Sequence, residues 1–316
     1  MQKMSTDQKT QLNSKKAKKK WSKPPFMSLP SLLQWSTAPF AESLQTVIFD
    51  MQHLISTALK SKELDPLQDL ALLFNTLKKY DCTRTYNEES GNQISLERNL
   101  CFINQAQTMG ANQYIDSIIL SKQVPLKPQS NHDLFNALMW MSLPQTRFNC
   151  AQAMYQASRV SHTQSKANRS SLEDRFTLFD ESGIALFSDD LEMIKLIENR
   201  AWKDLFYKQA ERCQTHLKLW IVGHGLYEQL LNPYVGLVAY GRCYHVDSKV
   251  FNYPSKKQRH LFDQIIAQDL ERQLGQQTLE LSAIPILGYP TWWPQQTSDF
   301  YNNSRYFRGP YPKHKP

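Results

Sequence analysis

The stretch Ser130-Asn131-His132-Asp133-Leu134-Phe135-Asn136-Ala137-Leu138-Met139-Trp140 decides how this chain folds, because its spacing predicts a helix with two different sides. Successive side chains on a helix are rotated by about 100°. The side chains that then share roughly a quarter turn are His132, Asp133, Asn136 and Trp140. The apolar side chains that point the other way are Leu134, Phe135, Leu138 and Met141. We expect one face to pack into the core and the other to line a pocket.

The chain before residue 162 is predicted to be helical. Apolar residues recur at helical spacing over residues 41–60 and 66–79, which predicts two amphipathic helices. Residues 114–120 predict a short helix, and residues 96–103 fit either a helix or a strand. Pro144 ends the quoted helix, and residues 145–158 predict the next one.

Clear strands are predicted only after residue 171. Residues 176–187 predict a β-hairpin, with Asp180-Glu181-Ser182-Gly183 as its turn and a positive φ at Gly183. Further strands are predicted over residues 217–222 and 235–246, and further helices over 189–200, 202–212, 223–231 and 257–274. The predicted fold class is helix-rich α+β: a helical amino-terminal half followed by a mixed half with a β-hairpin and a few short strands.

The two ends of the chain differ in composition from its middle. Residues 1–30 are rich first in lysine and then in proline, and we expect a disordered tail because they cannot bury enough apolar surface. Residues 31–308 are expected to form a single globular domain, with a subdivision near the polar segment 162–171, and residues 309–316 a flexible tail. With 316 residues, of which 41% are hydrophobic, the chain can bury a full core.

The net charge of +8 comes almost entirely from the amino terminus. Residues 1–23 contain eight lysines and one aspartate, so the rest of the chain is nearly neutral. A lysine run attracts phosphate or anionic lipid without selecting between them. We therefore expect weak, nonspecific anion binding by this tail, and the sequence identifies no specific partner.

The spacing of the cysteines and the hydropathy of the chain indicate the cellular compartment of the protein. The five cysteines are widely spaced, without a Cys-x-x-Cys pair, which argues against a disulfide framework or a structural zinc site and indicates a reducing compartment. No stretch approaches the roughly 20 apolar residues of a membrane-spanning helix. Prolines interrupt the segment after the basic amino terminus, where a signal peptide needs an apolar run. We expect a cytoplasmic location.

His132 and the residues beside it are the first candidates for chemistry. The spacing of Ser130 and Asp133 is that of a helix cap, which accounts for Asp133 without any catalytic role. The helix cap does not explain as well why His132 and Asn136 lie on the same face of the helix. The alternative is that His132 is a general base or a metal ligand oriented by a carboxylate.

His224 lies in a second candidate site, Gly223-His224-Gly225, at the point where a predicted strand becomes a helix. Glu228 follows four residues later and therefore shares a helix face with it. A histidine and a glutamate so placed can ligate one metal ion, or act as a base and its orienting group. Asp180 and Glu181, at the tip of the predicted hairpin, can reach into a cleft, although turn residues of this kind are also common without a function.

Aromatic and basic residues gather near the carboxy terminus. The candidates for substrate binding are Trp293, Tyr301, Arg305 and Arg308, together with Trp140 as a wall of the pocket. Arginine beside aromatic rings suits stacking on bases or sugars, or the binding of an anion. The alternative is a strap that packs over the core, with its arginines in ion pairs.

These blocks of sequence together resemble a known family. The blocks are Asn131 to Trp140 with Leu143-Pro144, Asp174 to Gly183, Gly223-His224-Gly225-Leu226, and Pro285 to Pro290 with Trp293. In this order, over about residues 35–308, they resemble DUF3025, a bacterial family of proteins of unknown function. The family pattern leads us to expect lysine where this chain has Arg147 and asparagine where it has Ser182. The resemblance implies no activity, only that the blocks belong together.

Three functions from different classes stay open. We favour a hydrolase-type enzyme in which His132, His224 and Glu228 meet Asp133 or Asp180-Glu181 around a cleft, with or without a divalent metal. The second is a nucleic-acid or phosphometabolite binding module that uses the carboxy-terminal aromatics and arginines. The third is a structural or partner-binding protein in which all the blocks serve packing. No nucleotide cofactor is expected, because the sequence has no glycine-rich phosphate loop or dinucleotide fingerprint.

Overall fold

The computed structural model describes residues 24–58, 67, 69–84, 100–105, 109–163 and 170–309. Residues 1–23 of the predicted tail 1–30, residues 310–316 of the predicted tail 309–316, and most of the segment 162–171 lie outside the described residues. Residues 24–28, which composition assigned to the amino-terminal tail, pack against the rest of the chain. Met27 is buried, and its backbone N–H donates to Asn131 Oδ1 over 2.9 Å.

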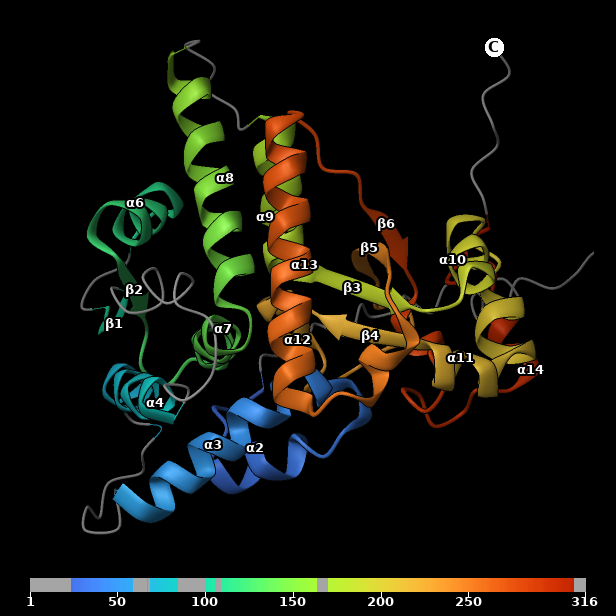
Figure 1. Ribbon diagram of the computed structural model, residues 1–316, viewed down its shortest axis with the longest axis horizontal. Helices are drawn as coiled ribbons and strands as arrows, with labels where there is room; N and C mark the ends of the chain where they lie inside the picture. Colours follow the sequence, from blue (N-terminus) through green and yellow to red (C-terminus); the bar gives the residue numbers. More distant parts are fainter. Residues whose placement is uncertain are drawn as a thin grey trace, which may run out of the picture.

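Helices dominate the described chain up to residue 163 (Figure 1). Every helix predicted there is present with shifted ends, and one more precedes them. They are α2 (Leu29–Trp35), α3 (Glu42–Ala58), α4 (Leu70–Arg84), α6 (Ala111–Ser121), α7 (Asn131–Ser142) and α8 (Pro144–Thr163). The ambiguous segment contains strand β1 (Cys101–Asn104), which pairs in parallel with β2 (Gln123–Leu126). Strand β2 was not predicted because it is short and contains Pro125, which usually argues against a strand.

The remainder of the chain is built on a four-stranded sheet of order β4-β3-β5-β6. Its strands are β3 (Gly183–Ser188), β4 (Leu217–Ile221), β5 (Ala239–His245) and β6 (Ser282–Ile284). Strand β3 lies parallel to β5 and antiparallel to β4, and all its residues are buried. The surrounding helices are α9 (Ser171–Ser182), α10 (Leu191–Glu198), a π-helix (Asp204–Lys208), α11 (Ala210–His216), α12 (His224–Gln229), α13 (Ser255–Gly275) and α14 (Ser298–Tyr301). The predicted helix-rich α+β class is confirmed.

Helix α13 joins the helical part to the sheet. It runs alongside α8, which in turn packs against α9 (Figure 1). On the sheet side, Phe262 of α13 stacks on Phe187 of β3 with ring centroids 3.7 Å apart and meets Trp220 of β4 edge-on at 5.0 Å. At the base of α8, the Asp263 carboxylate accepts hydrogen bonds from the backbone N–H groups of Gln145 and Thr146, over 3.1 and 2.8 Å. This satisfies helix-start donors that would otherwise lack partners.

The hairpin predicted over residues 176–187 is wrong. Residues 171–182 form helix α9, in which Phe176, Phe179 and Asp180 are buried on one face at the spacing of a helix. Strand β3 begins at Gly183 and pairs with β4 and β5 instead of with residues 176–179. Gly183 has a φ of −76°, so no positive φ is needed. It must be glycine for a different reason, because a Cβ there would collide with the Phe179 carbonyl oxygen.

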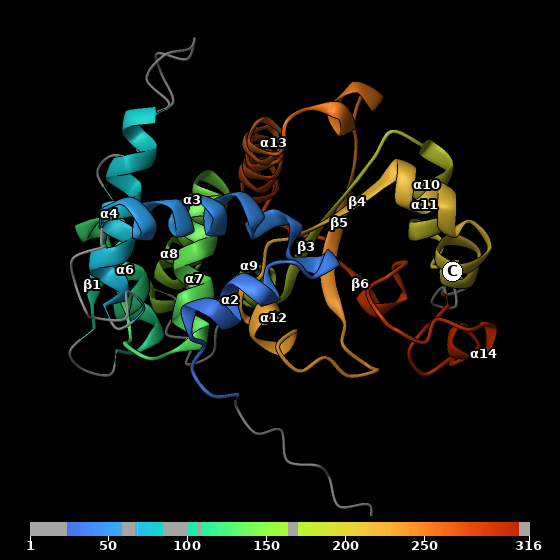
Figure 2. The same ribbon diagram turned by 90° about the horizontal axis from the view of Figure 1, so that it is seen from below.

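Helix α12 starts directly after β4 and lies against α7 and α9 (Figure 2). The close contact with α9 occurs at Gly223, where a Cβ would collide with backbone atoms of Glu181 and Gly183. This small residue brings the end of α9 against the start of α12. In the described part of the chain, no helix is long and apolar enough to cross a membrane.

We expect Gly223→Ala to lower the free energy of unfolding by about 1–3 kcal/mol, because backbone atoms must move to accept the added methyl group. Urea unfolding measures the change. Gly275→Ala is the matched control, since nothing lies within 4 Å of a Cβ at that position. It is expected to be neutral or slightly stabilising. Equal losses for the two variants would contradict the close approach at Gly223.

Candidate functional site

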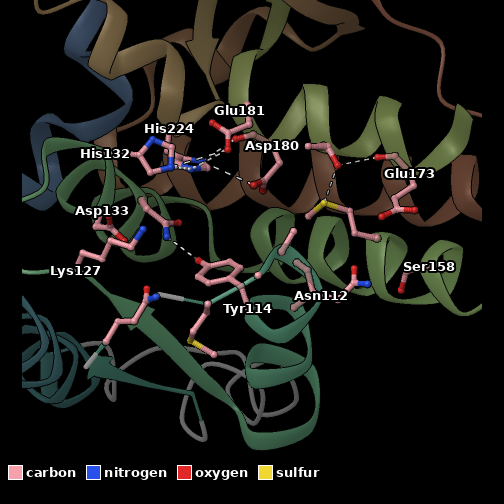
Figure 3. Close-up of a pocket in the computed structure, with 18 residues that line it drawn as sticks. Asn112, Tyr114, Lys127, His132, Asp133, Ser158, Glu173, Asp180, Glu181 and His224 are labelled. Atoms are coloured by element: carbon pink, nitrogen blue, oxygen red, sulfur yellow. Dashed lines mark hydrogen bonds and ion pairs between the residues drawn. The ribbon is translucent and has the colours of Figure 1, made fainter. Parts of the chain in front are cut away.

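A pocket of about 350 Å³ lies between α6, α7, α8 and α9, with the start of α12 at one end (Figure 3). His132, Asp133, Asp180, Glu181 and His224 gather at that end. Glu173 and Ser158 lie toward the other end, as Figure 3 shows. The apolar lining residues are Met109, Ala111, Ile115 and Met154.

The start of α7 places His132 at the pocket. Ser130 caps the helix: its Oγ accepts a hydrogen bond from the Asp133 backbone N–H over 3.2 Å and donates to Asp133 Oδ2 over 2.6 Å. This is the cap that the sequence predicted. Asp133 therefore serves the helix start and also lines the pocket. His132, in the first turn, has a side chain that is 36% exposed and open to the cavity.

His224 is the first residue of α12 and is buried, with a side chain 4% exposed. Its Nε2 atom lies 3.0 Å from His132 Nε2. The Glu181 carboxylate lies 3.6 Å from His224 Nε2 and 3.9 Å from His132 Nε2. One atom from each of these three side chains therefore falls within 4.8 Å of the other two, close enough to hold one metal ion.

The second nitrogen of each imidazole faces an acceptor. His224 Nδ1 lies 2.9 Å from the Asp180 carbonyl oxygen, which can only accept, so Nδ1 carries the proton. Arg147 Nη1 also lies 3.1 Å from this nitrogen, but it has the Asp180 oxygens as nearby acceptors. His132 Nδ1 lies 3.5 Å from the Glu228 carboxylate. The His132 tautomer decides whether the two Nε2 atoms share one hydrogen bond or present two lone pairs to a cation.

Arg147 lies behind this cluster with its side chain 2% exposed. It pairs with the Asp180 carboxylate and donates to the Asp180 carbonyl oxygen over 3.2 Å. Its Nη2 donates to Asn136 Oδ1 over 2.6 Å. Asn136 in turn donates from Nδ2 to the Tyr114 hydroxyl oxygen over 2.6 Å. A continuous polar network therefore connects α9, α8, α7 and α6.

Burial governs the ionisation of the cluster. It lowers the pKa of His224 well below the usual range, and the Arg147 charge lowers it further, so His224 is neutral at pH 7. Burial raises the pKa of Asp180, and the Arg147 guanidinium opposes that shift. Burial also raises the pKa of Glu181, with Asp180 acting in the same direction. A neutral imidazole is the form that binds a metal ion.

Most of the catalytic candidates predicted from sequence come together here. His132, Asp133, Asn136, Asp180, Glu181 and His224 line the pocket. Glu228 reaches the cluster through His132. Trp140 does not line the pocket; it is buried, with the Arg147 guanidinium 5.5 Å from its ring centroid.

The carboxy-terminal candidates lie far from the pocket. In Figures 1 and 2, α14 and α6 occupy opposite sides of the molecule. Tyr301 is buried, and its hydroxyl donates to the Gly288 carbonyl oxygen over 2.7 Å. Trp293 packs against the core, whereas Arg305 and Arg308 are exposed. The aromatic side chains pack over the core as the strap alternative expected, whereas the arginines are exposed and not in buried ion pairs.

Two residues of the site, Arg147 and Tyr114, were not predicted from sequence. The signal for Arg147 was weak but present: a cation in the first turn of a helix is opposed by the helix dipole, so it needs an acidic partner from elsewhere. Tyr114 had no comparable signal, because one tyrosine on an amphipathic helix is usually a packing residue.

We expect Arg147→Met to lower the free energy of unfolding by about 3–5 kcal/mol, because it leaves the Asp180 carboxylate buried without its counter-charge. Adding Asp180→Asn should recover part of this loss. Urea unfolding of the single and double variants measures both effects. Arg159→Met is the control, since the pair of Arg159 with Asp116 is 53% and 41% exposed and should contribute about 1 kcal/mol or less. Comparable losses for Arg147→Met and Arg159→Met would argue against the buried network.

Comparison with known proteins gives one match. The family model described as "Protein of unknown function (DUF3025)" matches residues 100–310, which include every residue of the pocket and its polar network. No curated protein matches the chain, and no solved structure does. The chain belongs to the DUF3025 family of proteins of unknown function.

Proposed function

We propose that this protein is a metal-assisted hydrolase whose divalent ion is held by His132, His224 and Glu181. The observation that carries the proposal is the approach of one ligand atom each from His132, His224 and Glu181 to within 4.8 Å of one another. With the proton of each imidazole on Nδ1, a cation between the two Nε2 atoms removes the repulsion between their lone pairs. The Glu181 carboxylate on the same side supplies a negative third ligand.

The distances suit a small divalent ion. Two ligand atoms that are each about 2.1 Å from a tetrahedral zinc ion lie about 3.4 Å apart. The observed separations among the three ligand atoms are 3.0, 3.6 and 3.9 Å, on either side of that value. Small side-chain adjustments therefore suffice, and His132 and Glu181 are exposed enough to make them.

The surroundings of the three ligands also resemble those of a catalytic metal site. Metal-binding histidines usually donate their other ring N–H to a carboxylate or a backbone carbonyl. Glu228 and the Asp180 carbonyl oxygen lie at these positions. Three protein ligands leave one coordination position open, as catalytic zinc sites require, and the pocket adjoins it. A metal ion held there lowers the pKa of bound water and polarises a substrate oxygen, which is the chemistry of hydrolysis.

The binding-module alternative has less support. Its aromatic residues are largely committed to packing, as Tyr301 shows. The cytoplasmic location and the bacterial origin expected from the sequence stay predictions. Cys101, Cys150, Cys213 and Cys243 are free thiols.

We expect the full chain to bind one Zn²⁺ ion in isothermal titration calorimetry. His132→Ala, His224→Ala and Glu181→Gln should each weaken binding by more than about 100-fold, because each removes a ligand. Glu228→Gln should weaken it by about 10–100-fold through the orientation of His132. Titrations with Mn²⁺, and with Fe²⁺ under anaerobic conditions, test the preferred metal, because two histidines and one carboxylate also hold iron in oxygenases.

His260→Ala is the control for this titration, because His260 is exposed on α13 outside the pocket. Its Zn²⁺ affinity should equal that of the unchanged chain. Circular dichroism of each variant separates lost ligation from lost folding. If folded His132→Ala binds Zn²⁺ as tightly as the unchanged chain does, the metal site is wrong.

Hydrolysis is tested with a panel of chromogenic esters, amides and phosphate esters and the Zn²⁺-loaded chain. We expect turnover of at least one class, lost when a chelator removes the metal and in Glu181→Gln. His260→Ala should retain it. Tight metal binding without turnover of any class would contradict the hydrolase assignment and leave the metal site intact.

A further inference from the structure

Tyr114 lines the same pocket as the histidine pair, although it belongs to a different helix. Its ring extends from α6 toward the side of the pocket that holds His132, as Figure 3 shows. The Tyr114 hydroxyl oxygen meets Asn136 Nδ2 over 2.6 Å. This contact determines whether the Tyr114 hydroxyl can donate a hydrogen bond to a ligand.

The orientation of the Asn136 amide is fixed by Arg147. A guanidinium only donates hydrogen bonds, so the Asn136 atom that lies 2.6 Å from Arg147 Nη2 must be the carbonyl oxygen. The amide nitrogen therefore faces Tyr114 and donates to it. A reversed amide would turn the Asn136 NH2 group toward Arg147 Nη2, so that two donors would face each other in a buried site.

The Tyr114 hydroxyl thus accepts one hydrogen bond and keeps its own proton to donate. Among the residues that the structure describes, Asn136 is its one hydrogen-bond partner, and Asn136 is the donor. Burial raises the pKa of Tyr114 to about 12, so the proton stays on the oxygen at neutral pH. The polar network therefore presents a neutral O–H donor at the wall of the pocket.

The charges near the histidine pair decide which kind of ligand group can lie beside the Tyr114 hydroxyl. The carboxylates of Asp133, Asp180, Glu181 and Glu228 outnumber the two cationic side chains, Arg147 and Lys127. One of those cations, Arg147, already pairs with Asp180. A divalent ion cancels this excess of two negative charges, and a phosphate group would restore it. A neutral group with one polarised oxygen is compatible with the site.

We propose that the pocket takes a small acyl compound, an amide or an ester, whose carbonyl oxygen accepts a hydrogen bond from the Tyr114 hydroxyl beside the metal ion. This inference rests on the proposed metal site. The apolar side chains of Ile115 and Met154 accommodate the hydrocarbon part of such a compound. Negative charge develops on the carbonyl oxygen during hydrolysis, and a preorganised O–H donor stabilises it.

Acetohydroxamate is the probe, because it binds metal ions through an acyl oxygen without being hydrolysed. Its affinity for the Zn²⁺-loaded full chain is measured by calorimetry. Tyr114→Phe should weaken this affinity by about tenfold or more, the effect of losing one hydrogen bond to a charged oxygen. The affinity for Zn²⁺ itself should not change. Asn136→Asp should also weaken acetohydroxamate binding, because its new carboxylate accepts the Tyr114 proton.

Tyr155→Phe is the matched control, because Tyr155 lies on α8 and does not line the pocket. It should bind acetohydroxamate as the unchanged chain does. If Zn²⁺ binds but Tyr114→Phe leaves acetohydroxamate affinity unchanged, this inference is overturned and the metal site survives. Tighter binding of inorganic phosphate than of acetohydroxamate overturns the acyl assignment. Failure of the unchanged chain to bind Zn²⁺ overturns both proposals.

Discussion

The buried guanidinium of Arg147 is the constraint around which the site is organised. A charge taken out of water costs several kcal/mol unless it is paired and hydrogen-bonded. Here the Asp180 carboxylate and carbonyl oxygen, from α9, and the Asn136 amide, from α7, pair with the two Nη groups of Arg147. The end of α9 and the middle of α7 must therefore lie on either side of α8. This placement also brings the Asp180 carbonyl oxygen to His224.

The histidine pair illustrates how much depends on this packing. His132 and His224 are 92 residues apart in the chain, yet their Nε2 atoms are 3.0 Å apart. His132 is positioned by a helix cap that its own neighbours supply. His224 instead depends on the close approach of α12 to α9, which requires glycine at residue 223. One half of the site is thus set locally, and the other half is set by contact between distant elements.

The residues of the candidate site and the residues that stabilise the fold lie in different parts of the molecule. The pocket lies among the helices of the first part and α9, whereas the four-stranded sheet and the carboxy-terminal segment contribute buried aromatic packing. Tyr306 shows the supporting role, because its hydroxyl donates to the Leu237 carbonyl oxygen and accepts from the Leu287 backbone N–H. Aromatic residues near a chain end can therefore suggest a binding surface from sequence while they hold that segment against the core in the fold.

The sequence by itself determined the features that depend on near neighbours. Helical periodicity predicted α3, α7 and α13, and Ser130 with Asp133 predicted the start of α7. Local patterns failed where distant contacts decide the outcome. Residues 176–179 were assigned to a hairpin strand, yet they form a helix, and strand β3 finds its partners in β4 and β5. The roles of Arg147 and Tyr114 were likewise hidden, because only the tertiary structure brings their partners within hydrogen-bond distance.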